Sequence, residues 1–586
     1  MPSAVKKNGS FMEFQIVGKD SWDSEQKCPT AQRHLDSKRL LSESAYRKEH
    51  MKSITYLFSI IMLFIAINAC SILQPYSIRK IAPSIPEQYR EKVLESLEEA
   101  GSNKKELLKV LYHYKEDHLK LQAASFLIAY MPDHCFADVS LVDSLGNTVA
   151  MNVMDFNTAM KVQAYIDSLE TQIGELRYKL IEKREDVKTM YAELLITHID
   201  AAFRAYEILP WTNQYSWEDF REYILPYRGS SEPISDWRSY FWEVFASSRD
   251  SIQDPLELAY VINDSSMKMF TFKDIFYYHS ADQGLAEMLE NKIGRCEDMT
   301  NFSIYAMRAN GLAVTSDFTP YWPDRSNNHA WNAIILPNEE VIPFMGCEAN
   351  PGKYNLQKRI AKVYRKLFSQ ELGTLADILP DSIKAPPWLG YKNFKDVTDK
   401  YRPVSDVTLQ VNQDKPFAYI AVFNDNKWQP IHWGSVDSTG VVVFSDMGRD
   451  IAYIPVFYEI VDTIMVEDKE KPKYEPIPAG APFILSEEGN VIAFDNEAVE
   501  IREEINNEFI MRKTGQGGIN KVKIDSTYTW FVWAEDEWRE VIDTTVTADS
   551  LVFEYYYPES LYKVEEDCLH PDPRIFTVEN GEVIFW

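Results

Sequence analysis

Cys296 and His329 are the two residues whose types and surroundings could carry out chemistry. Cys296 lies at the start of a helical stretch, in Gly294-Arg295-Cys296-Glu297-Asp298. The unpaired N–H groups and the positive dipole end of a helix N-terminus favour a thiolate, the nucleophilic form of cysteine. A histidine near such a thiol can accept its proton. A Cys/His pair that is distant in sequence and adjacent in the fold predicts attack on an amide or ester carbonyl.

The elements that must position this pair follow from the local patterns. Apolar residues share one face of the helix that begins at Cys296, and Asn310-Gly311 ends it. The segment from 312 to 318 alternates like a strand, and two further strands are expected at 329–336 and 341–345, joined by a turn at 337–340. We therefore expect His329 at the head of a hairpin that packs across the helix of Cys296.

Three motifs resemble the core of the transglutaminase-like superfamily in order and spacing. They are Gly294-Arg295-Cys296, the helix end Ala309-Asn310-Gly311-Leu312, and His329-Ala330-Trp331-Asn332. The resemblance implies a papain-type Cys-His-acid site on an antiparallel sheet, with Cys296 as the nucleophile and His329 as the general base. It favours hydrolysis by a peptidase or amidase over acyl transfer.

The third member of the implied site does not carry over by position. In the family an acid normally ends the strand after the hairpin, whereas this chain has Met345 there. A bulge or turn at Gly346 could bring Glu348 or Asn350 to the imidazole, where either side chain could accept a ring N–H. Glu348 is the favoured candidate. The alternative is a non-catalytic surface binding or assembly protein that retains the scaffold.

The N-terminal segment predicts export. No charged residue occurs from Ser53 to Ile78, basic residues precede this run, and Ile67-Asn68-Ala69-Cys70 resembles the lipobox of bacterial lipoproteins. We expect residues 1–50 to be an overextended start or leader, 51–70 a signal peptide, and Cys70 the lipidated residue. The mature protein would then be a membrane-anchored lipoprotein facing the periplasm or the cell surface. A single span over 54–73 and a buried core helix are the alternatives.

Charge and cysteine usage limit the partners. The chain has 61 basic and 89 acidic residues, a net charge of −28, so its surface repels phosphate backbones and nucleic acid is not an expected partner. Without Cys28 and Cys70, four cysteines remain, which is too few for a disulfide framework. No CxxC or HExxH pattern occurs, and neither a metal nor a cofactor is predicted. The expected substrate is a protein or peptide.

The remaining sequence completes an α+β multidomain expectation. A helical region at 71–209 includes an apolar seam at Val162, Ile166, Leu169, Ile173, Leu176 and Leu180, which is typical of a helical hairpin or short coiled coil. The transglutaminase-like domain is expected at 210–395, and its aromatic segment at 211–242 either lines a cleft or packs a seam.

The C-terminal third is rich in Val, Ile, Tyr and Trp, and it predicts two β-sandwich-like modules at 400–470 and 480–586. A stretch rich in Lys, Glu and Pro at 467–482 predicts a linker between them. Trp428, Trp433 and Trp538 are expected in the sandwich cores, with glycan contact as the alternative.

Overall fold

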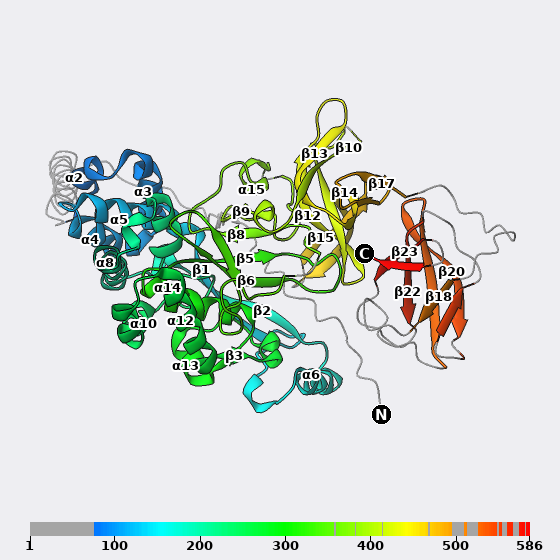
Figure 1. Ribbon diagram of the computed structural model, residues 1–586, viewed down its shortest axis with the longest axis horizontal. Helices are drawn as coiled ribbons and strands as arrows, with labels where there is room; N and C mark the ends of the chain where they lie inside the picture. The colour runs from blue at the N-terminus through cyan, green and yellow to red at the C-terminus, as the bar shows by residue number, and fades with distance from the viewer. Residues whose placement is uncertain are drawn as a thin grey trace, which may run out of the picture.

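The computed structural model describes residues 76–356, 359–380, 382–412, 414–466, 469–494, 509–512, 525–545, 547, 550–553, 560–566, 574–579 and 582–586. Within these residues the chain runs from a helical end, through a central sheet, to two β modules at the opposite end (Figure 1). The α+β multidomain expectation is confirmed. The predicted leader, signal peptide and lipidation site at Cys70 lie outside the described residues.

Helices form the N-terminal end of the described chain. They are α2 (Ile78–Ile81), α3 (Glu87–Glu99), α4 (Lys104–His113), α5 (His118–Tyr130), α7 (Asp186–Thr189) and α8 (Ala192–Ile208). Their apolar faces share one hydrophobic cluster with the central domain, reaching from Ile81 to Val397. The boundary predicted at 209 is therefore not a break in the hydrophobic core.

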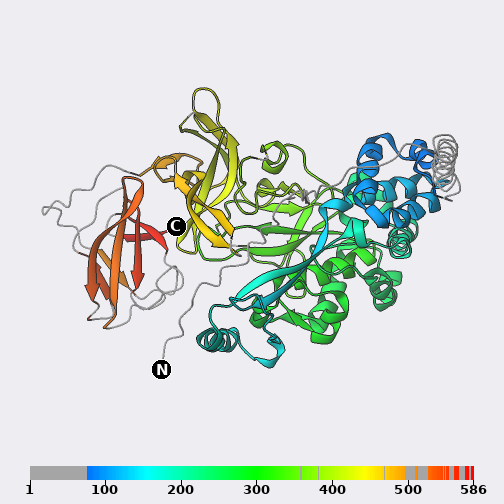
Figure 2. The same cartoon turned by 180° about the vertical axis from the view of Figure 1, so that it is seen from behind.

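The predicted helical region at 71–209 is interrupted between residues 135 and 185. This excursion contains β1 (Cys135–Val142), α6 (Ala159–Ile173) and β2 (Arg177–Glu185), with β1 and β2 paired antiparallel. The seam at 162–173 belongs to α6, but Gly174 has a φ of 89° and ends the helix, so Leu176 and Leu180 leave its apolar face. Figure 2 shows this hairpin and α6 reaching away from the helical end.

The central domain packs helices on an antiparallel sheet. Its helices are α9 (Trp217–Asp219), α10 (Trp237–Val244), α11 (Ala246–Ser251), α12 (Pro255–Met269), α13 (Leu285–Asn291), α14 (Cys296–Ala309) and α15 (Leu375–Ile378). Its strands are β5 (Ala313–Thr319), β6 (His329–Ile335), β7 (Val341–Phe344), β8 (Tyr364–Lys366) and β9 (Phe394–Asp396), in the order β7-β6-β5-β8-β9. The predicted nucleophile helix and the three strands after it are confirmed, and α14 packs on β5 and β6.

Two features explain why α14 ends where it does and what surrounds it. Gly311 has a φ of 69°, and a Cβ there would lie 2.7 Å from the Leu209 side chain, so the turn into β5 requires glycine. The indole N–H of Trp211 donates to the Gly311 carbonyl at 3.0 Å. Trp211, Trp237 and Trp242 are all buried in the core, so packing is the role of these residues of the aromatic segment.

The first C-terminal module is a six-stranded sheet with a two-stranded sheet beside it. Its strands are β10 (Val404–Gln410), β11 (Phe417–Asn424), β12 (Lys427–Ser435), β13 (Val441–Gly448), β14 (Ile451–Val466), β15 (Lys469–Pro478), β16 (Phe483–Leu485) and β17 (Val491–Ala493). The predicted linker is wrong, because β15 pairs with β14 along its whole length and β16 and β17 extend the same sheet. In the described sheet β15 pairs with β14 alone, and an edge strand tolerates the prolines that suggested a linker.

The second C-terminal module ends the chain (Figure 1, orange and red). Its strands are β18 (Phe509–Arg512), β19 (Thr527–Ala534), β20 (Glu537–Thr545), β21 (Ser550–Phe553), β22 (Tyr562–Glu566), β23 (Ile575–Glu579) and β24 (Glu582–Phe585). Both modules contribute to one apolar cluster that contains Trp428 and Trp533, whose rings meet edge to face at 5.9 Å. Trp433 and Trp538 are partly buried against this cluster. Core packing thus accounts for the three tryptophans, and glycan contact stays a prediction.

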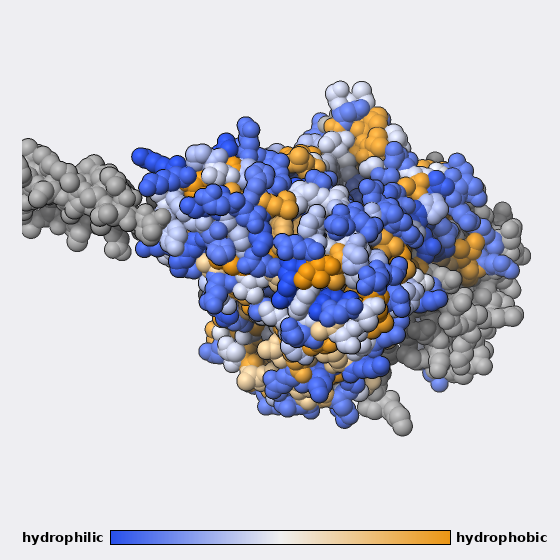
Figure 3. All heavy atoms as spheres, turned by 60° about the vertical axis from the view of Figure 1, so that its left-hand side comes forward, coloured by the Kyte–Doolittle hydropathy of each residue, from blue (hydrophilic) through white to orange (hydrophobic). Residues whose placement is uncertain are grey.

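The surface in Figure 3 is mostly hydrophilic, with apolar side chains scattered in small groups on the face shown. This agrees with the acidic composition of the chain. Among the described residues, no helix is both long enough and apolar enough to cross a bilayer.

Candidate active site

Cys296 is the first residue of α14, and the residue is partly buried. The short strand β4 (Ile293–Gly294) leads into it and pairs in parallel with β3 (Thr271–Phe272). A capping box closes the helix start: the Asp298 carboxylate accepts the Arg295 N–H at 2.9 Å, and it also accepts the Gln283 N–H at 3.0 Å. The Asp298 carboxylate therefore fixes the backbone at the start of α14, next to Cys296.

The residues that flank Cys296 are held by ion pairs that the sequence did not reveal. The Arg295 guanidinium contacts Asp282 at 2.5 Å, and the Lys366 ammonium contacts Glu297 at 2.5 Å. Lys366 also donates to the Ser230 hydroxyl at 2.9 Å. These contacts tie the start of α14 to strand β8 and to the segment before α10.

The thiol of Cys296 is neutral at ordinary pH. Burial, followed by the charge of Glu297, raises its pKa to about 11, against the opposing effects of Arg295 and of a hydrogen bond from the Ala330 backbone N–H. Loss of solvation thus acts against the thiolate that the helix N-terminus is expected to favour, and that expectation stays a prediction. Attack by this sulfur would need a base.

His329 is the first residue of β6, directly before Ala330, whose N–H reaches the Cys296 sulfur. The Cys296 sulfur therefore lies beside the backbone at the start of β6, and the pairing of its thiol with the His329 imidazole stays a prediction. The imidazole Nε2 lies 2.6 Å from the Tyr354 hydroxyl, and the Trp322 ring stacks near it with centroids 6.1 Å apart. Neither aromatic residue was predicted, since both belong to irregular segments with no periodic pattern.

Glu348 and Asn350, the two candidates for the third member of the site, lie in different surroundings. The Glu348 side chain is exposed, and its charge contributes, after burial, to raising the pKa of Tyr354. The Asn350 amide instead binds Asn263 at 3.0 Å and Asp264 at 2.7 Å, toward α12. The Tyr354 hydroxyl thus contacts Nε2, and Glu348 acts on Tyr354 through its charge. That Glu348 itself orients the imidazole stays a prediction.

The last residue of the family-like motif, Asn332, joins three parts of the site. Its amide donates to the Thr300 carbonyl of α14 at 3.2 Å, and its oxygen accepts the Gly346 N–H at 3.1 Å. A Cβ at Gly346 would approach that oxygen to 2.6 Å, so glycine is required there. Asn332 therefore locks β6 onto the nucleophile helix and onto the turn after β7.

The other two described cysteines, Cys347 and Cys135, have thiols whose pKa is raised by burial. Cys347 is buried, its sulfur lies 3.7 Å from the Ser303 hydroxyl, and burial raises its pKa to about 12. Burial also raises the pKa of Cys135. No group of His, Cys, Asp and Glu in the described part of the chain is arranged to hold a metal ion.

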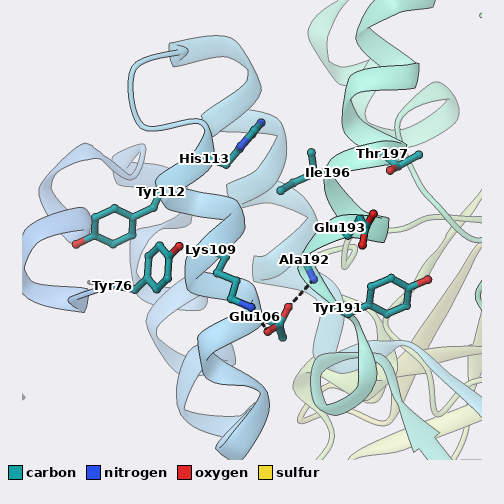
Figure 4. Close-up of a pocket in the computed structure, with 10 residues that line it drawn as sticks. All are labelled: Tyr76, Glu106, Lys109, Tyr112, His113, Tyr191, Ala192, Glu193, Ile196 and Thr197. Atoms are coloured by element: carbon teal, nitrogen blue, oxygen red, sulfur yellow. Dashed lines mark hydrogen bonds and ion pairs between the residues drawn. The ribbon is translucent and has the colours of Figure 1, made fainter. Parts of the chain in front are cut away.

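A hollow lies between α4 and α8, away from Cys296 (Figure 4). Glu106 in its wall pairs with Lys109 and accepts the Ala192 N–H at 3.0 Å. This hydrogen bond and ion pair join the two helices, so the polar lining has a structural role. The surroundings of Cys296 therefore remain the candidate site of the described chain.

Comparison with known proteins agrees with this assignment. The model of the transglutaminase-like superfamily matches residues 245–344, a range that includes Cys296 and His329 and ends with β7. No curated protein matches the chain.

Proposed function

The chain contains a transglutaminase-like superfamily domain with a cysteine-protease-like core, and from this premise we propose that it is an exported peptidase or amidase that works through an acyl-enzyme on Cys296. The observation that carries the proposal is the placement of the Cys296 thiol, at a helix N-terminus and within reach of the backbone N–H that follows His329. Such a placement is the arrangement a thiol acyl transfer requires.

The proposed reaction begins with attack of the Cys296 sulfur on a carbonyl carbon while His329 takes the thiol proton. The Cys296 N–H, in the first turn of α14, has no helical acceptor and can donate to the oxyanion. The C–N bond then breaks, the leaving amine takes the proton from His329, and a thioester remains. Water, deprotonated by His329, attacks the thioester, which releases the acid and returns the proton to sulfur. An amine in place of water would give acyl transfer.

Alkylation of Cys296 by iodoacetamide, followed by mass spectrometry of the native and unfolded chain, tests the proposal. A pKa of about 11, compared with about 8.5 for a free thiol, would make native Cys296 about 300-fold slower than the unfolded residue at pH 7 if no base assisted it. With His329 acting as the base, we expect the native thiol to react faster than the unfolded one. Cys347 is the internal control, since it is buried and has no such base.

The alternative is a binding or assembly protein with an inactive scaffold. The same alkylation measurement distinguishes it from the enzyme. Native Cys296 reacting at or below its unfolded rate would refute the enzyme. The Cys296→Ala variant establishes which labelled peptide belongs to the site.

Tyr354→Phe is expected to slow this alkylation at pH 7 by about tenfold, because the variant loses the hydroxyl 2.6 Å from Nε2 that orients the imidazole. Glu348→Gln is the matched comparison and should have a smaller effect, since the Glu348 side chain is exposed. A larger effect of Glu348→Gln than of Tyr354→Phe would instead assign the orienting role to the carboxylate.

Export and anchoring form part of the proposal and are supported by the sequence alone. The uncharged run from Ser53 and the lipobox-like Ile67-Asn68-Ala69-Cys70 favour a lipoprotein facing the periplasm or cell surface. Metabolic labelling with a radioactive fatty acid in a bacterial host tests it, with Cys70→Ser as the control. Absence of label from the wild-type chain would contradict lipidation.

A further inference from the structure

The loop between β5 and β6 lies over the proposed base. The ring of Trp322, a residue of this loop, stacks near two other rings. Its centroid lies 6.1 Å from that of the His329 ring and 6.3 Å from that of the Trp331 ring. The Trp322 N–H donates to the Asn327 carbonyl at 3.2 Å, which closes the loop on itself. The Trp322 ring is itself buried. The position of this ring therefore depends on what holds the loop backbone.

Asn424, nearly a hundred residues further along the chain, holds that backbone. Its side-chain nitrogen lies 2.9 Å from the Trp322 carbonyl, 2.8 Å from that of Arg325 and 3.0 Å from that of Asn327. Asn424 is the last residue of β11 and is only 2% exposed. A single buried amide group thus donates to carbonyls at three positions of the loop.

A second donor reaches the same loop from the last sheet of the chain. Arg574, directly before β23, donates to the carbonyl of Pro323 and, at 2.8 Å, to that of Phe423 next to Asn424. Arg574 is 3% exposed. Burial alone would raise the pKa of Asp324 in this loop, but Arg325, followed by Arg574 and Arg359, lowers it. Both C-terminal sheets therefore contact the loop through buried donors.

We propose that Asn424 is a positioning residue for His329, and that the C-terminal β modules regulate the thiol site by holding the 320–328 loop closed over the imidazole. The inference rests on the proposed function of Cys296 and His329. Removing the Asn424 amide takes a donor away from three backbone carbonyls of the loop, so the closed loop loses hydrogen bonds that water can replace when the loop opens. Opening moves Trp322 away, so the imidazole gains both solvent and rotational freedom.

Asn424→Ala and Asn424→Asp in the full chain test this role. Aspartate preserves the volume of the side chain but cannot donate when ionised, which separates hydrogen bonding from packing. Asn426→Gly is the matched control: it removes an amide from the same hairpin, glycine accepts the φ of 60° found there, and Asn426 contacts Lys563 and Glu565 rather than the loop.

Hydrogen exchange of the 322–328 amides is the first readout. We expect at least tenfold faster exchange in both Asn424 variants and wild-type rates in Asn426→Gly. The second readout is the pH profile of Cys296 alkylation, in which the Asn424 variants should lose about tenfold in rate at pH 7. Unchanged exchange in both Asn424 variants, or an open loop with an unchanged pH profile, would overturn the proposal.

The two readouts separate this proposal from the proposed function. Failure of thiol activation is seen in the wild-type chain itself, as a Cys296 no more reactive than in the unfolded protein, and it removes the regulatory role as well. Failure of the loop contact is seen by hydrogen exchange in the variants while wild-type Cys296 remains activated.

Discussion

His329→Asn is expected to slow alkylation of Cys296 at pH 7 by about 10²- to 10⁴-fold, the usual contribution of a general base. The sign follows from the pKa of about 11 that burial imposes on the thiol. Without a base, only the ionised fraction reacts, and that fraction rises about tenfold per pH unit until the pH reaches the pKa. The variant should therefore show a steep rise in rate from pH 7 toward 11, whereas the wild type should already react near pH 7.

Measuring the rate from pH 6 to 10 by mass spectrometry checks this expectation. Asparagine retains a polar side chain at the head of β6 and cannot accept a proton at these pH values. His113→Asn is the control, because His113 is exposed on α4 and lies outside the site. Parallel pH profiles for the wild type and His329→Asn would remove His329 from the mechanism.

The part of the site that could be predicted depends on local patterns. The helix at 296–309 and strands β6 and β7 follow from periodicity and from the glycine that ends the helix, so Cys296 and His329 could be placed without the fold. Tyr354 could not, because it lies in an irregular segment whose path is set by tertiary contacts. The role of Asn424 is harder still to predict, because the backbone carbonyls that it binds lie 97 to 102 residues earlier in the sequence.

The wrong predictions have physical causes of the same kind. The predicted apolar seam crosses Gly174, although glycine commonly ends a helix and does so here. Beyond it, pairing with β1 makes Arg177–Glu185 a strand. The prolines in Lys469–Pro478 predict a linker, because proline has no N–H to donate to a neighbouring strand. A strand at the edge of a sheet tolerates them, since the N–H groups on its outer side have no partner strand. In both cases pairing with another strand outweighed the local pattern.

The buried ion pair between Asp317 and Arg365 supports the sheet that carries His329. The two residues face each other across β5 and β8, and they form two hydrogen bonds of 2.9 and 2.8 Å. The Tyr401 hydroxyl donates to the same carboxylate at 2.6 Å. Burial alone would lower the pKa of Arg365, but the charge and hydrogen bonds of Asp317 raise it, so the guanidinium is charged inside the core.

Asp317→Ala is expected to lower the free energy of unfolding by about 3–5 kcal/mol, because it leaves the Arg365 cation buried without a counter-charge. Chemical denaturation followed by tryptophan fluorescence measures the loss. Glu182→Ala, which breaks an exposed 3.0 Å contact with Arg184, should cost under about 1 kcal/mol.

The double variant Asp317→Val/Arg365→Met separates loss of the pair from loss of packing. Apolar replacement of both partners removes the isolated charge, so most of the lost stability should return, apart from about 1 kcal/mol for the Tyr401 hydroxyl left without its acceptor. A double variant as unstable as Asp317→Ala would mean that the sheet depends on the hydrogen bonds themselves. Because Thr319 of β5 pairs with His329 of β6, that outcome would also connect the ion pair to the placement of the base.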